Sequence, residues 1–268
     1  MRLSEPAPAK LNLALNVRGK LPDGRHSLET VFAFCTDGDW LEAEPAGTLS
    51  LEVRGPFAGD LDDGHDNLVL GAARALAGEA GLEPQASLIL TKNLPVASGI
   101  GGGSADAAAT LRLLSRLWNI EPRFAIDAAP KIGSDVPACL LSLAATGTGA
   151  GDRLQLLEDP TISGTPVLLV NPRIALSTRD VFAAWDGEDR GSLGAWREGR
   201  NDLEAPARAL VPQIGEVMDW LGAQPGASFV RMSGSGATCF ALFESEGDRD
   251  ASAAACPPGW WHLATFLR

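Results

Sequence analysis

The chain has 268 residues, of which 45% are hydrophobic, so it is long and apolar enough for one large domain or two modest ones with a buried core. Its formal net charge of −12 argues against nucleic-acid binding, which needs a broad basic surface. No apolar run approaches the ~20 residues of a membrane span, and the N-terminus lacks the pattern of a secretory signal. We therefore expect a soluble, cytoplasmic protein without nucleic-acid or membrane partners.

The cysteine and histidine residues form no recognisable metal or disulfide pattern. The four cysteines and three histidines lie far apart, and no C-x-x-C pair occurs. This spacing argues against a zinc site and favours free thiols in a reducing compartment. A phosphate ligand is still compatible with the acidic charge, because backbone N–H groups and one or two cations can hold it locally.

The first half of the chain opens with strands. Polar and apolar residues alternate over 9–17, which predicts a strand, and Pro22-Asp23-Gly24 predicts a turn after it. The next elements expected are strands over 28–34 and 40–53, a helix entered near Asp66 and ended near Gly81, and a strand over 86–94. Because several strands precede the first helix, the pattern favours an α+β fold over a doubly wound sheet.

The stretch Gly99-Ile100-Gly101-Gly102-Gly103-Ser104 follows that strand and leads into a helix predicted from about Ser104 to Trp118. The first N–H groups of a helix have no intrahelical partner, the helix dipole is positive there, and glycines let an anion approach the backbone. The stretch therefore predicts a phosphate site. It is neither a P-loop, since no Lys follows the glycines, nor a dinucleotide fingerprint, since Ser104 takes the place of its last glycine. The alternative is a glycine turn that only packs a helix on a sheet.

The second half mixes helices and strands without an internal repeat. We expect, in chain order, a turn-like segment over 133–137, a glycine-rich hairpin over 144–157, a buried strand over 165–172, a helix over 177–185, a polar loop over 186–200, a helix with proline interruptions over 201–223, a strand, glycine turn and strand over 227–243, and a C-terminal segment over 260–267 that closes a sheet. The hairpin and Pro160 place a domain boundary near residue 155.

Three other features have an ordinary explanation when each is taken alone. Asp135 beside Pro137 is typical of a turn residue that bonds its own backbone, Lys10 is typical of a solvated strand residue, and 231–240 is typical of a plain hairpin. Their combination with the glycine stretch changes this interpretation only if Asp135 comes close to Lys10.

Seven segments, in order along the chain, resemble the GHMP kinase superfamily of small-molecule kinases. They are APAKLNLALNV, PDGRH, DNLVLGAA, KNLPVASGIGGGSADAAA, IGSDVP, NDLE and MSGSGATCF. The resemblance implies an α+β two-domain fold. It implies an N-terminal ribosomal-protein-S5-domain-2-like nucleotide-binding domain over 1–155 and a C-terminal ferredoxin-like α/β sandwich domain over 156–268.

PDGRH and the opening APAKLNLALNV are similar to the branch of the superfamily whose substrate is a cytidine diphosphate ester of methylerythritol. The implied activity is transfer of a phosphoryl group from ATP, with Mg²⁺, to the 2-hydroxyl of that substrate in the non-mevalonate isoprenoid pathway. A kinase for homoserine, a mevalonate-type alcohol or a sugar is the closest alternative. A nucleotide-binding regulator without turnover is another, which the presence of Lys10 and Asp135 disfavours.

The resemblance also implies the roles of individual residues. Lys10 and Asp135 match the catalytic pair of the family. The positions that match ATP contacts are Asn67, Lys92, Pro95, Val96, Ala97, Ser98, Gly99, Ile100, Gly101, Gly102, Gly103, Ser104 and Ala105. The positions that match substrate contacts are Asn12, Arg25, His26, Phe32, Thr178, Phe182, Gly234, Ser235 and Gly236, with His26 at the cytosine end. No metal ligand is assigned.

One position departs from the family pattern. The family usually has P-D-G-Y-H-E, whereas this chain has PDGRHS, and it contains no Tyr at all. Arg25 therefore stands where a Tyr would stack on cytosine. A guanidinium plane can stack on a base or reach a diphosphate, so base binding is compatible with the change.

Overall fold

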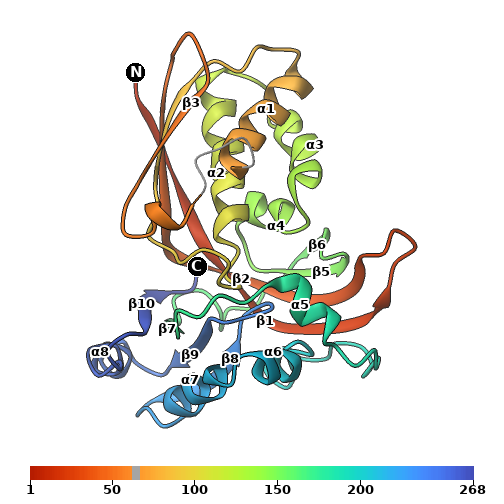
Figure 1. Cartoon of the computed structure of the whole chain (residues 1–268), viewed down its shortest axis with the longest axis vertical. Helices are drawn as coiled ribbons and strands as arrows, with labels where there is room; N and C mark the ends of the chain where they lie inside the picture. The colour runs from red at the N-terminus through yellow and green to blue at the C-terminus, as the bar shows by residue number, and fades with distance from the viewer. Residues whose placement is uncertain (62–66) are drawn as a thin grey trace. The chain divides into compact units, whose positions relative to one another are not determined.

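The computed structural model of the chain describes residues 1–61 and 67–268 (Figure 1). The chain forms two compact units, each assembled from separate segments. The first unit is Met1–Ala9, Asp37–Val96 and Gly101–Ser142, and the second is Lys10–Thr36, Ala97–Ile100 and Leu143–Arg268. Strands β1 (Leu3–Lys20) and β2 (His26–Glu44) contribute residues to both units. Because both units are discontinuous, a single boundary at residue 155 stays a prediction.

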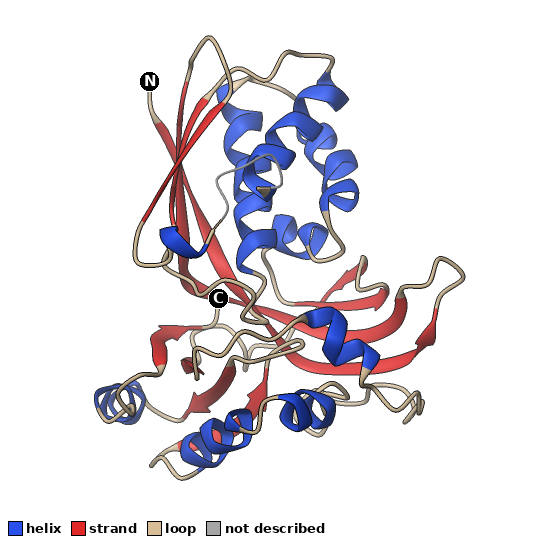
Figure 2. Ribbon diagram, viewed as in Figure 1, coloured by secondary structure: helices blue, strands red, loops and turns tan. Residues whose placement is uncertain are grey.

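The first unit combines strands with a group of helices (Figure 2). Strand β4 (Ser87–Thr91) pairs antiparallel with β2 over Trp40–Glu44 and parallel with β3 (Ser50–Arg54). A short 3₁₀ turn, η1, spans Ala58–Asp60. The helices are α1 (Leu68–Ala80), α2 (Gly102–Leu117), α3 (Pro122–Ile132) and α4 (Val136–Leu141).

Helix α2 lies at the centre of the helical group and contacts α1, α3 and α4. Its buried side chains are mainly Ala and Leu, and small residues let neighbouring helices approach closely. Helix α1 begins at Leu68, where the side chain of Asn67 accepts a hydrogen bond from the N–H of Val69, and it ends at the left-handed residue Gly81, as predicted. The predicted start near Asp66 lies outside the described residues.

The second unit contains a sheet in which β5 (Ala145–Gly149) pairs antiparallel with β2 and with β6 (Arg153–Leu156). A further sheet has the order β10-β7-β9-β8, all antiparallel. Its strands are β7 (Pro166–Asn171), β8 (Ala227–Met232), β9 (Cys239–Phe243) and β10 (Trp261–Phe266). The helices are α5 (Thr178–Ala183), α6 (Glu204–Leu210), α7 (Gln213–Gly222) and α8 (Glu246–Ala254).

Along the chain, β7, helices, β8, β9, α8 and β10 follow one another as a β-α-β-β-α-β unit. This is the ferredoxin-like arrangement predicted for the C-terminal part. Its core is a cluster of buried apolar side chains that includes Leu168, Val170, Ile214, Val217 and Leu221. Each fully buried Val, Ile or Leu contributes about 1.5–3 kcal/mol relative to an exposed one, so this cluster is the main source of stability here.

Most predicted elements are confirmed, including the hairpin β5–β6, the helix α5, the loop over 186–200 and the closing strand β10. Strands are confirmed within the predicted ranges 28–34 and 40–53, but their bounds are wrong, because residues 35–39 also belong to a strand and residues 45–49 do not. Strand β2 runs without a break to Glu44, because Gly38 packs tightly against the backbone of Ala7 and Asp39 is buried among hydrogen-bond partners. Helices α3 and α8 were not predicted, and the turn expected over 133–137 passes into α4 at Val136.

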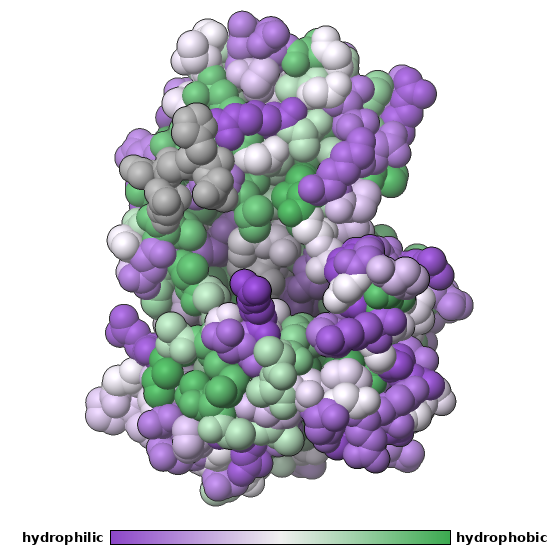
Figure 3. Space-filling model, turned by 45° about the vertical axis from the view of Figure 1, so that its right-hand side comes forward, coloured by the Kyte–Doolittle hydropathy of each residue, from purple (hydrophilic) through white to green (hydrophobic). Residues whose placement is uncertain are grey.

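Hydrophilic side chains are spread over the face shown in Figure 3, with apolar side chains between them. Among the residues that the structure describes, no helix is long and apolar enough to cross a membrane.

Candidate functional site

The predicted phosphate site lies at the start of α2 in the first unit. Gly101 precedes the helix with a φ of 66°, and no side chain caps this end. The N–H of Ala105 donates to the carbonyl of Gly101 at 2.7 Å, which closes the first helical turn. The N–H groups of the residues before Ala105 therefore lack an intrahelical acceptor, and they lie at the positive end of the helix dipole. This geometry suits an anion.

Residues 97–100 of the same stretch belong to the second unit, where they contact the C-terminal glycine segment. Ser233 Oγ donates to the carbonyl of Gly99 at 3.0 Å, and the N–H of Thr238 donates to the carbonyl of Ser98 at 3.1 Å. Gly99 has a φ of 78°, and a Cβ there would lie 2.5 Å from the carbonyl oxygen of Gly236. The structure thus brings together two glycine segments that are more than 130 residues apart in the sequence.

Lys10 is buried rather than solvated. Its Nζ donates to Asn12 Oδ1 at 2.8 Å and lies 5.5 Å from the ring centroid of Phe32. Asn12 is held in turn, since its Nδ2 donates to Thr30 Oγ1 at 2.8 Å and its N–H donates to Ser233 Oγ at 3.2 Å. The ammonium group therefore has a fixed position, and the structure brings together three predicted site residues and the glycine segment near Ser233.

An aromatic cluster contains two predicted substrate residues. The ring of His26 stacks on Phe182, with centroids 4.5 Å apart, and meets Trp185 edge-on at 5.7 Å. Burial and the nearby charge of Lys20 lower the pKa of His26, so this imidazole is neutral at pH 7. Among the described residues, His26 Nε2 and Trp185 Nε1 are buried without a hydrogen-bond partner. The unpartnered Nε2 of His26 is thus available for a ligand.

Arg25 lies apart from this stacking. Its side chain is 53% exposed, and its guanidinium pairs with Asp23 at 2.8 Å and with Asp152 at 3.5 Å. Thr178, another predicted substrate residue, shares a hydrogen bond of 2.8 Å with Ser235 of the glycine segment. The carboxylates therefore hold Arg25 at the turn after β1, and Thr178 joins α5 to the glycine segment.

Asp135, the other member of the predicted catalytic pair, is half-buried in the first unit. It precedes α4, and its carbonyl accepts the N–H of Cys139 at 3.0 Å, while its side chain does not cap the helix. Lys10 belongs to the second unit, so the pairing of these two residues stays a prediction.

Two residues predicted to contact ATP, Asn67 and Lys92, have well-defined contacts within the first unit. Asn67 caps α1. Lys92 is 1% exposed, and its Nζ donates to carboxylate oxygens of Asp39 and Asp106. Sequence reasoning assigned no role to this pair of acids. Asp106 stands among alanines in an otherwise apolar stretch of α2, and an acid at such a position signals a buried cation nearby.

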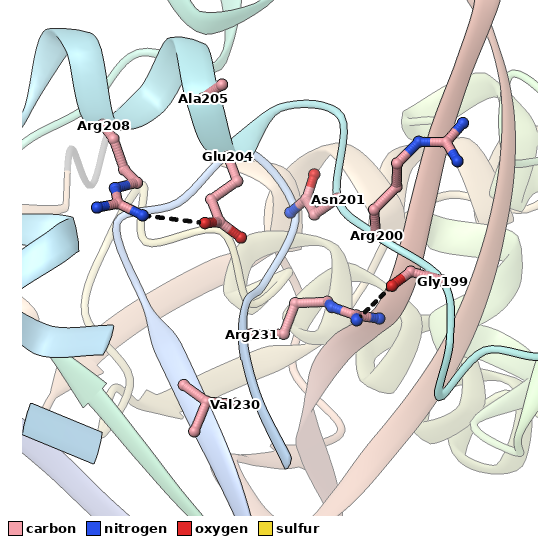
Figure 4. A pocket seen from close by; sticks show the side chains of 8 residues that line it. All are labelled: Gly199, Arg200, Asn201, Glu204, Ala205, Arg208, Val230 and Arg231. Atoms are coloured by element: carbon pink, nitrogen blue, oxygen red, sulfur yellow. Dashed lines mark hydrogen bonds and ion pairs between the residues drawn. The ribbon is translucent and has the colours of Figure 1, made fainter. Parts of the chain in front are cut away.

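A polar cavity of about 510 Å³ lies in the second unit (Figure 4). Its lining residues are Gly199, Arg200, Asn201, Glu204, Ala205, Arg208, Val230 and Arg231. Arg231 points toward Gly199 in Figure 4 and donates to the carbonyls of Leu13, Trp196 and Gly199, and burial lowers its pKa to about 10.

Asn201, another residue of this cavity, donates to the carbonyls of Met232 and Gly234 at 2.9 and 2.7 Å. Arg231 and Asn201 thus tie β1 and the glycine segment together. The sequence analysis assigned a role to neither residue, although Asn201 lies in the motif NDLE and Arg231 directly precedes the motif MSGSGATCF. Within the described ranges, no three or more His, Cys, Asp or Glu side chains gather closely enough to hold a metal ion.

Comparison with known families matches both halves of the chain. Residues 67–142 match the GHMP kinases N terminal domain, and residues 183–257 match the GHMP kinases C terminal family. Together the two matches cover more than half of the chain.

Two bacterial proteins named 4-diphosphocytidyl-2-C-methyl-D-erythritol kinase are similar over the full length. The protein of Rhizorhabdus wittichii is 52% identical, with 100% of this chain and 96% of the relative covered. The protein of Novosphingobium aromaticivorans is 51% identical, with 100% and 94% covered.

Solved structures agree with these relatives. The crystal structure of a 4-(cytidine 5'-diphospho)-2C-methyl-D-erythritol kinase superposes with a TM-score of 0.85 at 33% identity, covering 100% of this chain and 99% of that one. A homoserine kinase from Cytophaga hutchinsonii superposes with a TM-score of 0.71 at 16% identity, covering 99% and 95%, and this likeness shows the shared fold alone.

Proposed function

We infer that this chain, which belongs to the 4-diphosphocytidyl-2-C-methyl-D-erythritol kinase family of the GHMP kinases, is an ATP-dependent kinase of the non-mevalonate isoprenoid pathway. It phosphorylates the 2-hydroxyl of 4-diphosphocytidyl-2-C-methyl-D-erythritol and gives the 2-phosphate and ADP. The observation that carries this function is the identity of about half of all residues over the whole chain. The buried, fixed ammonium of Lys10 supports it, because phosphoryl transfer needs a positioned cation.

ATP binding is proposed for residues 95–105 with Asn67 and Lys92. Phosphoryl transfer asks the protein mainly for in-line positioning and for stabilisation of charge on the phosphate oxygens. The uncapped start of α2 at Gly101 offers backbone N–H groups and the positive end of a helix dipole to those oxygens. Bound Mg²⁺ would neutralise phosphate charge, and the phosphates of ATP would supply many of its ligands.

Lys10 and Asp135 are proposed as the catalytic pair. Asp135 accepts the proton of the attacking 2-hydroxyl or orients that hydroxyl for in-line attack. Lys10 stabilises the negative charge on the transferred group. Asn12 and Phe32 restrict the Lys10 ammonium to one position, so little reorganisation is needed when charge develops.

The cytidine end of the substrate is proposed to bind at His26 and Phe182, and its diphosphate is proposed to lie near the glycine segment Gly234-Ser235-Gly236. An aromatic ring offers a stacking surface to a base, and the unpartnered Nε2 of His26 offers a hydrogen bond to its edge. Arg25, which pairs with Asp23 and Asp152, replaces the expected Tyr without taking over its stacking. A cytoplasmic location is proposed with this function.

The test is phosphoryl transfer from Mg·ATP, followed by phosphorus NMR, with 4-diphosphocytidyl-2-C-methyl-D-erythritol, homoserine and mevalonate in parallel reactions. We expect a new phosphate monoester signal with the cytidyl substrate alone. Transfer to homoserine or mevalonate instead would contradict the proposed substrate. The chain would then still be a kinase of the GHMP type, but for another alcohol.

A further inference from the structure

Three charged side chains are buried together against the first turn of α2. Lys92 Nζ donates to Oδ2 of Asp39 and, at 2.7 Å, to Oδ2 of Asp106, and these side chains are 2%, 0% and 3% exposed. A Cβ on Gly102 would lie 3.0 Å from Lys92 Nζ. The ammonium therefore lies directly against the residue that begins the helix.

The two carboxylates differ in how many hydrogen bonds they receive. Oδ1 of Asp39 accepts the backbone N–H groups of Asn93 at 2.5 Å and Leu94 at 2.8 Å, so both of its oxygens are used. Oδ1 of Asp106 is buried and has no hydrogen-bond partner among the described residues. A buried, charged oxygen without a partner is costly, and protonation of the carboxyl reduces that cost.

The charge balance of the cluster leads to the same conclusion. One ammonium and two carboxylates sum to −1 when all three are ionised, and this charge would oppose an anion at the start of α2. A proton on Asp106 brings the sum to zero. Burial, with a further contribution from Asp39, raises the pKa of Asp106 to about 8 despite the opposing effect of Lys92.

The helices that pack on α2 carry other charged groups. Helices α1 and α3 pack on α2, and α4 carries no charged residue. Apart from Asp106, the charged residues of α1, α2 and α3 are Arg74, Glu79, Arg112, Arg116, Arg123, Asp127 and Lys131. Lys131 pairs with Glu79, Arg112 pairs with Glu5, and the charged groups that shift the pKa of Asp106 are Lys92 and Asp39.

We propose that Lys92, Asp39 and Asp106 are positioning residues for the phosphate-binding stretch and that the cluster works with a proton on Asp106. This inference rests on the proposed ATP-dependent function. Asp39 fixes the backbone at Asn93 and Leu94, just before the stretch, and Asp106 fixes the first turn of α2 just after it. The same ammonium holds both carboxyl groups. Loss of the Asp106 proton places a negative charge under the bound phosphates and weakens nucleotide binding.

The two acids are therefore expected to respond differently to the same substitution. Asp106→Asn keeps the shape and hydrogen-bonding capacity of a protonated carboxyl, so Mg·ADP should bind within about threefold of wild type at pH 7.5. Asp39→Asn replaces one of two accepting oxygens with a donor, so affinity should fall about tenfold or more. The control is Asp127→Asn, which replaces an exposed acid on α3 and should leave the affinity for Mg·ADP unchanged.

The experiment is calorimetric titration with Mg·ADP from pH 7.5 to 9.5, where the nucleotide phosphates are already ionised, with thermal unfolding as a check on folding. Wild-type affinity should fall about tenfold over this range, and Asp106→Asn should remove that fall. Equal losses in Asp106→Asn and Asp39→Asn, or an unchanged pH profile in Asp106→Asn, would overturn the proposal.

Infrared difference spectroscopy tests the proton without nucleotide or catalysis. A band of a protonated carboxyl at pH 7 that is missing in Asp106→Asn supports the proposal, and its absence from wild type contradicts it even if Asp39→Asn fails to fold. Wild type that shows this band but does not bind Mg·ADP would contradict the kinase function and leave the protonated cluster standing.

Discussion

The ring of His26 stacks on the ring of Phe182 with centroids 4.5 Å apart and planes inclined by 24°. Stacked rings this close leave no room for a third ring between them. A cytosine base must therefore stack on the outer side of one ring or displace it. The pocket proposed for the base is thus partly filled by the protein's own aromatic side chains, and this arrangement suggests how a chain without Tyr keeps a stacking surface.

Phe182→Ala tests this stacking surface. Base–aromatic stacking is worth about 1–3 kcal/mol, so we expect the KM for the cytidyl substrate to rise about tenfold or more while the KM for ATP stays within twofold. Trp185→Phe is the matched control. Its Nε1 has no partner within the described residues, so replacing the indole by another ring should change either KM by less than about threefold. If Phe182→Ala raised both KM values equally, the ring of Phe182 would stabilise the fold in general and would not bind the base specifically.

His26 gives a pH dependence with a defined sign. Burial and Lys20 lower the folded-state pKa of His26 below 6.5, so the unfolded chain binds the proton more readily. The free energy of unfolding should therefore decrease as the pH falls through 6.5 toward the folded pKa. Urea denaturation from pH 8 to 5 should show a steeper loss for wild type than for His26→Gln. Parallel curves would mean that His26 titrates alike in both states.

The sequence predicted the regular elements well where one periodicity dominates. Alternation identified β1, and the glycine-to-alanine run identified α2. The sequence did not predict the strand over 35–39, because Gly38 and Asp39 have low strand propensity. Their positions are fixed by contacts with backbone that is distant in the sequence. Helix α8 was not predicted because its sequence contains no apolar residue larger than Ala. Arg249 of this helix donates a hydrogen bond to the carbonyl of Thr265.

The candidate site was predicted mainly from motifs that follow one another in a fixed order. The motifs identify site residues, but they do not identify the side chains and backbone groups that those residues contact. Nothing local connects Asp39 with Lys92, which lies 53 residues further along the chain. The contact of Ser233 with Gly99 likewise spans 134 residues. Such pairs depend on tertiary structure, so the sequence predicted a phosphate-binding helix start without the buried charges that support it.

Lys10→Met and Asp135→Asn test the proposed catalytic pair. Each removes a group that acts on the reacting atoms, so we expect kcat to fall by about 10²–10⁴ while Mg·ADP binds within about threefold of wild type. If both residues act on the same transition state, the double variant should lose little more than either single one, because effects within a catalytic unit are not additive. Fully additive losses would show independent roles. Asn12→Ala should give a smaller loss of about tenfold, since it frees Lys10 without removing its charge.

Gly99→Ala tests whether the close contact between the two glycine segments matters. The new Cβ would require an unfavourable φ of 78° and would lie 2.5 Å from the carbonyl oxygen of Gly236 and 2.6 Å from that of Ser233. Backbone atoms cannot move aside as a flexible side chain can, so we expect a loss of about 2–3 kcal/mol in the free energy of unfolding. Kinetically, the KM for the cytidyl substrate should rise, because the strain is applied to the segment proposed to bind its diphosphate.

The matched control for Gly99→Ala is Gly71→Ala in the interior of α1. A Cβ at Gly71 meets nothing within 4 Å, so this variant should be stabilised by about 0.5–1 kcal/mol through the higher helix propensity of Ala. Chemical denaturation of both variants measures the difference in their free energies of unfolding. If Gly99→Ala is as stable as wild type and keeps its KM, the segments must separate at no cost, and the contact seen between Gly99 and Gly236 has no part in shaping the site.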